Sequence, residues 1–173
     1  SIHLFAIDRI SGALREAGAA VAGLAHTDEF AYSIAGRNAH WGTPPNGAAP
    51  DRIPGGSTSG PASAVAAGQA EIGLGTDTAG SVRVPASYQG LWGLRSTHGS
   101  TSSAGLLPLA PRFDAIGWVA RDAATLRAAV AAGLAGGPSA RSPAAAVTQG
   151  PDTRSGSDTN PVPERVRAVG ATE

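Results

Sequence analysis

Residues 55–95 decide the fold, and they read GGSTSGPASAVAAGQAEIGLGTDTAGSVRVPASYQGLWGLR. Two turns rich in Gly and Ser flank a short apolar strand, and each turn places a serine beside glycines. Because Gly reaches backbone angles that other residues avoid, such turns can aim several N–H groups at one point. The stretch therefore predicts a cradle for an oxyanion or a phosphate.

Three blocks of this stretch resemble the amidase signature family, hydrolases that cut amide C–N bonds with two serines and a lysine. The blocks are residues 55–60 (GGSTSG), 75–87 (GTDTAGSVRVPAS) and 90–95 (GLWGLR). Ser57 and Ser81 stand 24 positions apart, which is the spacing of the family. The resemblance implies an α/β protein with part of the amidase signature fold, a mixed twisted sheet flanked by helices on both faces.

The resemblance also implies a role for each residue of the two turns. Ser81 is the expected nucleophile, and Ser57, after a cis peptide bond, is expected to relay the proton to a lysine. The expected oxyanion hole consists of the backbone N–H groups of Thr78, Ala79, Gly80 and Ser81. Asp77 and Arg83 are expected to brace the loop as a pair. The implied reaction is hydrolysis of a carboxylic amide to an acid and ammonia or an amine, without a cofactor or a metal.

The sequence departs from the family pattern at three places. Thr58 stands where a second serine is usual, and Ala79 stands where a glycine is usual. The implied lysine should precede Ser57, but residues 1–56 contain none, and neither does the rest of the chain. We therefore expect an amidase fragment with little or no activity alone, cut before the lysine and before the later substrate-binding half.

Other functions stay open at this point. The chain could be a non-catalytic fragment, a subunit that needs a partner chain carrying the lysine, or a relic of the A subunit of a tRNA-dependent amidotransferase. His98 and Asp114 allow a Ser-His-Asp hydrolase, but the chain has no G-x-S-x-G turn. The phosphate-binding motif G-x-x-x-x-G-K-[ST] is also missing.

The segment before the signature predicts scaffold and then a long loop. Apolar residues at steps of three or four predict a helix over residues 8–17, and a strand is expected over residues 20–25. Prolines and an Asn-Gly pair predict a loop in the second half of residues 26–51. Four side chains there suggest loop hydrogen bonding rather than a metal site: His26, Asp28, Glu29 and His40. Three aromatic side chains are expected to pack this loop on the core rather than to line a pocket: Phe30, Tyr32 and Trp41.

The pattern around and after the signature predicts alternating elements. We expect a helix that ends at Gly68, a strand over residues 71–75 and a helix over residues 82–88. Residues 113–121 are similar to the next strand of the amidase signature family, so the resemblance implies a strand there. Asp122 is expected to cap a helix over residues 123–134. The Pro-rich stretch after Gly136 has no aromatic residue. We therefore expect a central amidase part over residues 1–135 and a disordered or non-homologous tail over residues 136–173.

Composition limits the partners. Thirteen Arg balance thirteen acidic residues, so no long-range field attracts nucleic acid or an anionic membrane. The absence of Cys excludes disulfides, thiolate metal ligands and a cysteine nucleophile. We see neither a signal-peptide pattern nor a membrane-spanning apolar run, and we expect a cytoplasmic protein. The expected partners are a small-molecule amide and, where one forms, a homodimer or a complementing chain.

Overall fold

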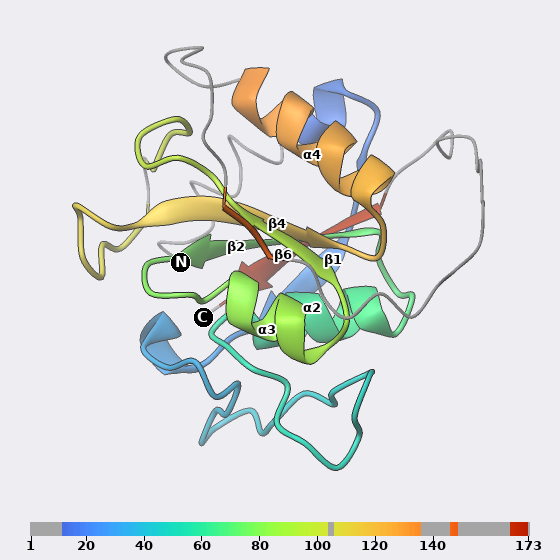
Figure 1. Ribbon diagram of the computed structural model, residues 1–173, viewed down its shortest axis with the longest axis vertical. Helices are drawn as coiled ribbons and strands as arrows, with labels where there is room; N and C mark the ends of the chain where they lie inside the picture. Colours follow the sequence, from blue (N-terminus) through green and yellow to red (C-terminus); the bar gives the residue numbers. More distant parts are fainter. Residues whose placement is uncertain (1–11, 104–105, 136–145, 149–166, 173) are drawn as a thin grey trace.

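A six-stranded mixed sheet forms the centre of the computed structural model, which describes residues 12–103, 106–135, 146–148 and 167–172 (Figure 1). The strands are β1 (Ala20–His26), β2 (Ile72–Asp77), β3 (Trp92–Arg95), β4 (Ala115–Ala120), β5 (Ala146–Thr148) and β6 (Arg167–Thr172). Their order is β1-β6-β2-β4-β3-β5. β6 runs parallel to β1 and β2, whereas β4 is antiparallel to β2 and β3, and β5 is antiparallel to β3. The predicted mixed sheet is therefore confirmed.

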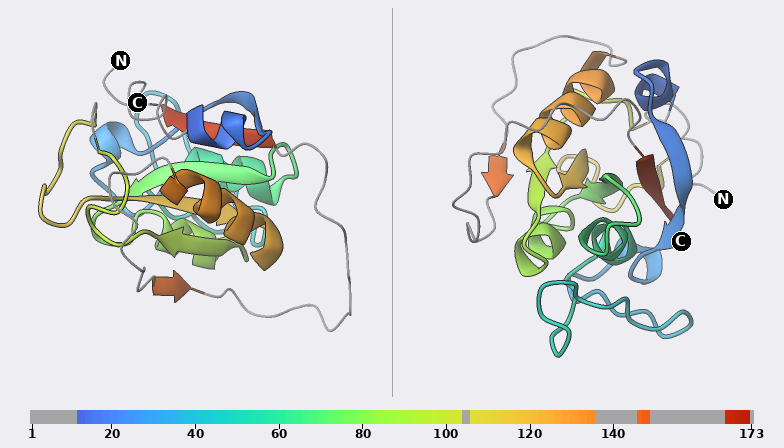
Figure 2. Two further views of the ribbon diagram at one scale, coloured as in Figure 1. Left: turned by 90° about the horizontal axis from the view of Figure 1, so that it is seen from above. Right: turned by 90° about the vertical axis from the view of Figure 1, so that its right-hand side faces the viewer.

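Helices cover both faces of this sheet (Figures 1 and 2). The helices α2 (Ser59–Ala66) and α3 (Arg83–Tyr88) lie on one face, and α4 (Ala123–Ala135) lies on the other. Gly68 ends α2 with a φ of +74°, which an L side chain rarely adopts. Asp122 caps α4, because its Oδ1 accepts the N–H of Thr125 at 2.7 Å. These helix ends agree with the sequence prediction.

The core has two parts, one on each face of the sheet. Alternate residues of β2 and β4 point to α4, and the intervening residues point to α2 and α3. The part under α4 contains Leu14, Ile72, Leu74, Leu94, Ile116, Trp118, Ala120, Leu126 and Ala129. The part under α2 and α3 contains Ala62, Val65, Ala70, Val82, Ala86, Leu91 and Val119. Small side chains dominate the second part, so its helices can lie close to the strands.

The predictions for the two ends of the chain fall partly outside the described residues. Residues 12–16 are helical, but the start of the helix expected over residues 8–17 lies outside the described residues. Most of the tail expected over residues 136–173 also lies outside them. Two segments of that tail form β5 and β6, which pair with the sheet. Short apolar stretches in these segments give strands once neighbouring strands offer them partners.

Candidate active site

The two Gly-rich turns lie against each other in the structure. The backbone N–H of Thr58 donates to the carbonyl oxygen of Ser81 at 3.0 Å. Ser57 is 1% exposed and Ser81 is 6% exposed. The Gly56–Ser57 peptide bond is cis, which agrees with what the resemblance implies. The fold thus brings together two serines that stand 24 positions apart in the sequence.

Each of these serines is followed by a residue that packs on a glycine of the sheet. Gly75 in β2 is the register partner of Gly117 in β4. A Cβ at Gly75 would overlap the Thr58 side chain, and a Cβ at Gly117 would lie 2.9 Å from Val82 Cγ2. Thr58 and Val82 are both buried. Because paired residues on one face of a sheet lie about 4.5–5.5 Å apart, the two glycines seat the serine turns side by side.

Replacing Gly75 is expected to disturb this seat. Gly75→Ala forces the buried Thr58 side chain to move, and we expect the free energy of unfolding to fall by about 1–3 kcal/mol. Urea unfolding of the chain measures the change. The matched control is Gly23→Ala in β1, where an added Cβ meets nothing within 4 Å. Equal losses in the two variants would contradict the close approach at Gly75.

Asp77, the last residue of β2, fixes the shape of the second turn. Its Oδ1 accepts the Gly80 N–H at 2.9 Å and Arg83 Nη2 at 2.9 Å. Its Oδ2 accepts the N–H of Val82 at 3.1 Å, the N–H of Arg83 at 3.2 Å and Arg83 Nε at 3.0 Å. The predicted bracing pair is therefore present as a two-pronged ion pair, and the carboxylate also holds three backbone N–H groups.

The surroundings of Asp77 stabilise its charged form. Burial by itself would raise the pKa of Asp77, but hydrogen bonds from the Arg83 side chain and from the Val82 and Arg83 N–H groups, with the Arg83 charge, outweigh burial. The pKa of Asp77 therefore lies below its ordinary value. The hydrogen bond to Asp77 in turn raises the pKa of Arg83. The Asp77 carboxyl group therefore stays ionised at neutral pH, where it holds the turn.

The N–H groups of the second turn divide into two kinds. The Gly80 N–H is already engaged by Asp77, so the prediction that it is a free oxyanion donor does not fit this arrangement. The other predicted donors have N–H groups without a hydrogen-bond partner among the described residues: Thr78, Ala79 and Ser81. Three donors from one short loop thus remain for a ligand oxygen.

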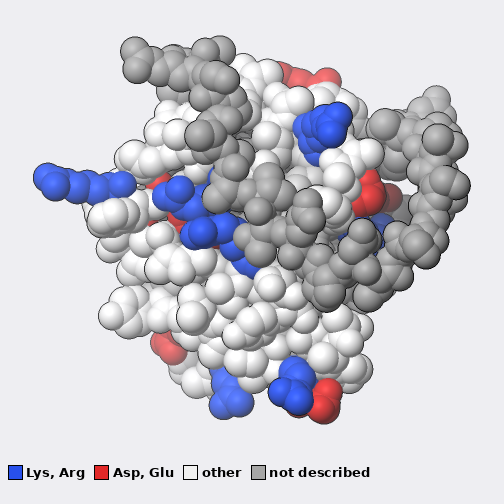
Figure 3. Space-filling model, in the orientation of Figure 1, with Lys and Arg blue, Asp and Glu red and all other residues white. Residues whose placement is uncertain are grey.

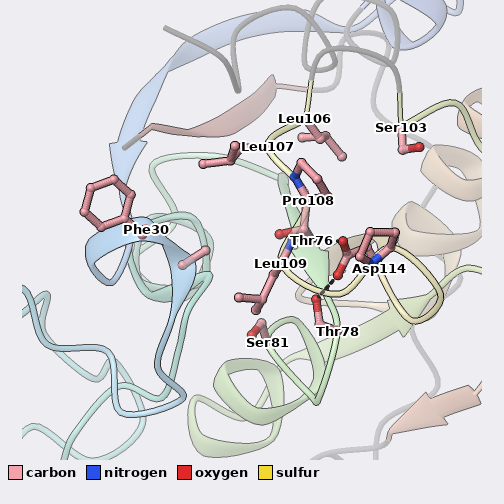
Figure 4. A pocket seen from close by; sticks show the side chains of 12 residues that line it. Phe30, Thr76, Thr78, Ser81, Ser103, Leu106, Leu107, Pro108, Leu109 and Asp114 are labelled. Atoms are coloured by element: carbon pink, nitrogen blue, oxygen red, sulfur yellow. Dashed lines mark hydrogen bonds between the residues drawn. The ribbon is translucent and has the colours of Figure 1, made fainter.

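A small pocket opens beside these donors (Figure 4). Its volume is about 100 Å³. It is lined by Phe30, Ala31, Thr76, Thr78, Ser81, Ser103, Leu106, Leu107, Pro108, Leu109, Pro111 and Asp114. Figure 4 shows Ser81 and Thr78 on the side of α3, with Leu106 and Leu107 on the opposite side. The pocket places a hydroxyl beside an apolar wall, which suits a small molecule that carries a polar group at one end.

The aromatic residues of the preceding loop do not pack on the core as predicted. The exposed fractions are 66% for Phe30, 78% for Tyr32 and 68% for Trp41. Phe30 and Ala31 have φ angles of 50° and 56°, in the left-handed region that residues with a Cβ seldom adopt. Phe30 lines the pocket instead, which was the alternative to core packing.

The polar residues considered for a metal site lie apart from one another. His40 Nε2 lies 3.6 Å from Glu29 Oε1 at an exposed position, whereas Asp28 is buried and accepts the Gly36 N–H at 3.0 Å. In the described part of the chain, no group of three or more His, Cys, Asp and Glu side chains is placed to hold a metal ion. On the face in Figure 3, charged side chains stand in small separate groups on a largely uncharged surface.

Three charged residues hold the site through contacts that the sequence did not predict. The Asp28 N–H donates to the Ser57 carbonyl at 3.3 Å. Arg95 Nε donates to the Asp77 carbonyl at 3.2 Å. Asp114 binds the second turn through its carboxylate, and His98 Nδ1 contacts only its main-chain oxygen, at 2.9 Å. The signal that could have found them is a charged residue within an apolar strand or at its end.

Comparison with known proteins points to one family. The sequence profile of the Amidase family matches residues 9–166, which extends past residue 135, where we expected the central amidase part to end. Amidase 1 of Arabidopsis thaliana is 57% identical over 118 residues, which cover 68% of this chain and 28% of that protein. The protein named translocon at the outer membrane of chloroplasts 64, from Pisum sativum, is 50% identical over a match that covers 66% of this chain and 19% of that protein. The A subunit of glutamyl-tRNA(Gln) amidotransferase from Methanothermobacter thermautotrophicus is 46% identical over a match that covers 63% of this chain and 24% of that protein.

Solved structures also resemble this chain in fold and in sequence. A vestigial protein complex, described as revealing the evolutionary origins of an s-triazine catabolic enzyme, contains a chain with a TM-score of 0.70 and 41% identity. The match covers 72% of this chain and 27% of that one. Allophanate hydrolase of Kluyveromyces lactis has a TM-score of 0.66 and 34% identity, and the match covers 72% of this chain and 20% of that one. The chain thus spans roughly a quarter of the length of the proteins that it resembles.

The relatives correct the expectation about location. One is named after the outer membrane of chloroplasts, and another is named a mitochondrial outer envelope protein. This finding overturns the expected cytoplasmic location. That expectation rested on missing signals, and targeting signals are segments separate from the folded core. In the described part of the chain, no helix is both long enough and apolar enough to span a bilayer.

Fold, site geometry and sequence agree. The sheet with helices on both faces matches solved amidases, the two serine turns meet on paired glycines, and the family profile covers nearly the whole sequence. The chain therefore belongs to the Amidase family of hydrolases.

Proposed function

We propose that this chain carries the serine pair and the oxyanion-binding loop of an amidase, which hydrolyses a carboxylic amide to an acid and ammonia or an amine. The observation that carries the proposal is the hydrogen bond that joins the two turns, from the Thr58 N–H to the Ser81 carbonyl at 3.0 Å. It joins the turns of two buried serines, and Ser81 lines a pocket beside the unengaged N–H groups. This is the arrangement that acyl transfer needs.

The proposed reaction begins with attack of Ser81 Oγ on the amide carbon. A C–O bond forms, and the carbonyl oxygen becomes an oxyanion that accepts hydrogen bonds from the N–H groups of Thr78, Ala79 and Ser81. The Ser81 proton passes through Ser57 Oγ to a neutral lysine amine and then to the leaving nitrogen as the C–N bond breaks. Water releases the acid from Ser81 by the reverse sequence. The loss of one oxyanion donor typically lowers the rate by about 10²- to 10³-fold.

The missing base gives the first test of this mechanism. None of the 173 residues is Lys, so we expect the purified chain to release no ammonia from small primary amides above background. Arg cannot replace Lys, because its guanidinium stays protonated. The matched protein is a chimera in which residues 20–135 replace the matching segment of Arabidopsis Amidase 1, which supplies the rest of the fold. We expect the chimera to hydrolyse the same amides.

Two results would contradict the lysine relay or the proposed active centre. If the 173-residue chain hydrolyses amides and loses that activity in Ser81→Ala, the base lies inside the chain and the lysine relay is wrong. If neither the chain nor the folded chimera is active, the proposal that these residues form a working amidase centre fails.

A second candidate is a subunit that works with a complementing chain. Two relatives are named as parts of assemblies: the A subunit of an amidotransferase and a member of a vestigial protein complex. In this case a partner, rather than the same polypeptide, supplies the lysine. Co-purification with a Lys-containing amidase chain, followed by activity that depends on both, would support it. A well-behaved monomer that binds no such chain would contradict it.

A further inference from the structure

Asp114 connects two walls of the pocket through one carboxylate. Its Oδ1 accepts the Thr78 hydroxyl at 2.5 Å and the Ala110 N–H at 3.0 Å. Its Oδ2 accepts the Leu109 N–H at 3.0 Å and the Ala110 N–H at 3.1 Å. Asp114 immediately precedes β4, so the sheet fixes its position. One carboxylate therefore holds both the turn that carries Ser81 and the loop that faces it.

The two elements that Asp114 holds have different tasks in the proposed site. Thr78 lies in the turn that offers N–H groups beside Ser81, and Leu109 lies on the apolar wall. Figure 4 shows the Thr78 hydroxyl directed at Asp114, with Leu109 and Ser81 nearby. Asp114 also lines the pocket. The position of this carboxylate therefore affects both the donors and the space that receives the substrate.

The carboxylate of Asp114 does not serve a catalytic triad. His98 Nδ1 contacts the Asp114 main-chain oxygen, and the carboxylate oxygens are taken by Thr78, Leu109 and Ala110. His98 is also not among the residues that line the pocket. An Asp that orients a catalytic His would bind the ring through its carboxylate. The geometry therefore leaves a different role for this residue.

We propose that Asp114 is a positioning residue that sets the separation between the free N–H donors of the second turn and the pocket wall at Leu109. The proposal rests on the amide hydrolysis proposed above. Its physical basis is that the Thr78 side chain, once fixed by Asp114, fixes the backbone that aims the Thr78 N–H. A displacement of about 1 Å in such a donor can lower the rate by about 10²-fold.

The test uses three variants in the chimera with small primary amides. Thr78→Val removes the hydroxyl and keeps the shape, and we expect kcat to fall by about 10-fold or more while KM changes by less than about 3-fold. Asp114→Asn leaves one acceptor oxygen for the hydroxyl of Thr78 and the N–H groups of Leu109 and Ala110, so the hold on Leu109 weakens as well, and we expect kcat to fall and KM to rise. Thr78→Ser keeps the hydroxyl and is expected to retain kcat within about 3-fold. The double variant is expected to be no slower than Asp114→Asn, because both changes remove one interaction.

A second measurement separates positioning from general loss of structure. An alkylboronic acid that adds to a serine mimics the tetrahedral oxyanion, and we expect Thr78→Val to weaken its binding by at least about 10-fold. Binding of the carboxylate product, which forms no such oxyanion, is expected to change little. The matched control is Asp122→Asn, since Asp122 also binds a Thr hydroxyl and its N–H, at Thr125, but lies at the start of α4. We expect it to lower the unfolding temperature and to leave kcat unchanged.

The outcomes distinguish this inference from the proposed function. If Ser81→Ala abolishes activity while folded Thr78→Val and Asp114→Asn keep kcat within about 2-fold, the role of Asp114 is wrong and the proposed function stands. If Ser81→Ala keeps its activity, the proposed function itself fails. If Asp114→Asn does not fold, Thr78→Val alone decides the matter.

Discussion

Ser81→Ala is expected to lower kcat/KM for amide hydrolysis in the chimera by about 10⁴- to 10⁶-fold. Removal of a nucleophile that forms a covalent intermediate has effects of this size, because the remaining groups have no bond to make. Ser57→Ala is expected to be nearly as damaging, since the Ser81 proton then has no route to the base. The measurement is ammonia release under saturating and limiting amide concentrations.

The control for this prediction is Ser87→Ala in α3. Ser87 lies near the same turn but is not among the residues that line the pocket, so we expect its kcat/KM to change by less than about 2-fold. Circular dichroism of all three variants checks that they are folded. Substantial activity in folded Ser81→Ala would assign the nucleophile elsewhere and would overturn the proposed mechanism.

Asp77→Ala is expected to lower the free energy of unfolding by about 3–5 kcal/mol, the loss typical of breaking a buried ion pair. Asp77 is 0% exposed and accepts five hydrogen bonds from Gly80, Val82 and Arg83. The variant leaves the buried Gly80 and Val82 N–H groups without their partner and removes the partner of the Arg83 side chain, which is 32% exposed. Urea unfolding measures the loss, and a drop of less than about 1 kcal/mol would contradict the bracing role.

An exposed ion pair provides the control for Asp77. Asp51 Oδ2 lies 3.5 Å from Arg52 Nε, and the two side chains are 81% and 77% exposed. Because water and salt screen such pairs, Asp51→Ala is expected to change the stability little. The contrast between the two aspartates tests whether burial and backbone contacts, rather than pairing with Arg alone, determine the effect.

The lowered pKa of Asp77 fixes the sign of a pH effect on the same stability. A carboxyl group with a folded-state pKa below its unfolded value stabilises the fold above the unfolded pKa, which is about 3.9 for Asp. This contribution is lost as the pH falls from there through the lower folded pKa. Between about pH 5 and pH 8, Asp77 adds no slope to the stability of the chain.

The elements nearest the serines could be predicted because their signals are local. Apolar residues bounded by glycines indicated β2, Asp122 indicated the start of α4, and Gly68 indicated the end of α2. The pairing order of the strands depends on contacts between distant residues, which a single sequence does not display. For this reason the insertion of β6 between β1 and β2 was not foreseen.

The candidate site was predictable in its residues but not in its contacts. Ser57, Ser81 and the Asp77–Arg83 pair follow from the resemblance. The engagement of the Gly80 N–H and the link from Asp114 to Thr78 arise from tertiary packing. The outward turn at Phe30 reverses the general tendency of aromatic residues to pack inside.

The glycine pair under the serine turns has a wider consequence. Gly75 and Gly117 are register partners, so their spacing is a property of the sheet backbone and not of any side chain. The sheet backbone therefore sets the spacing of the two serine turns. Loop residues such as Phe30 and Leu107 line or border the pocket and can change without altering the glycine pair that sets the spacing of the two turns. Substitutions in these loops can therefore change which molecules the pocket accepts while the backbone that carries Ser57 and Ser81 stays the same.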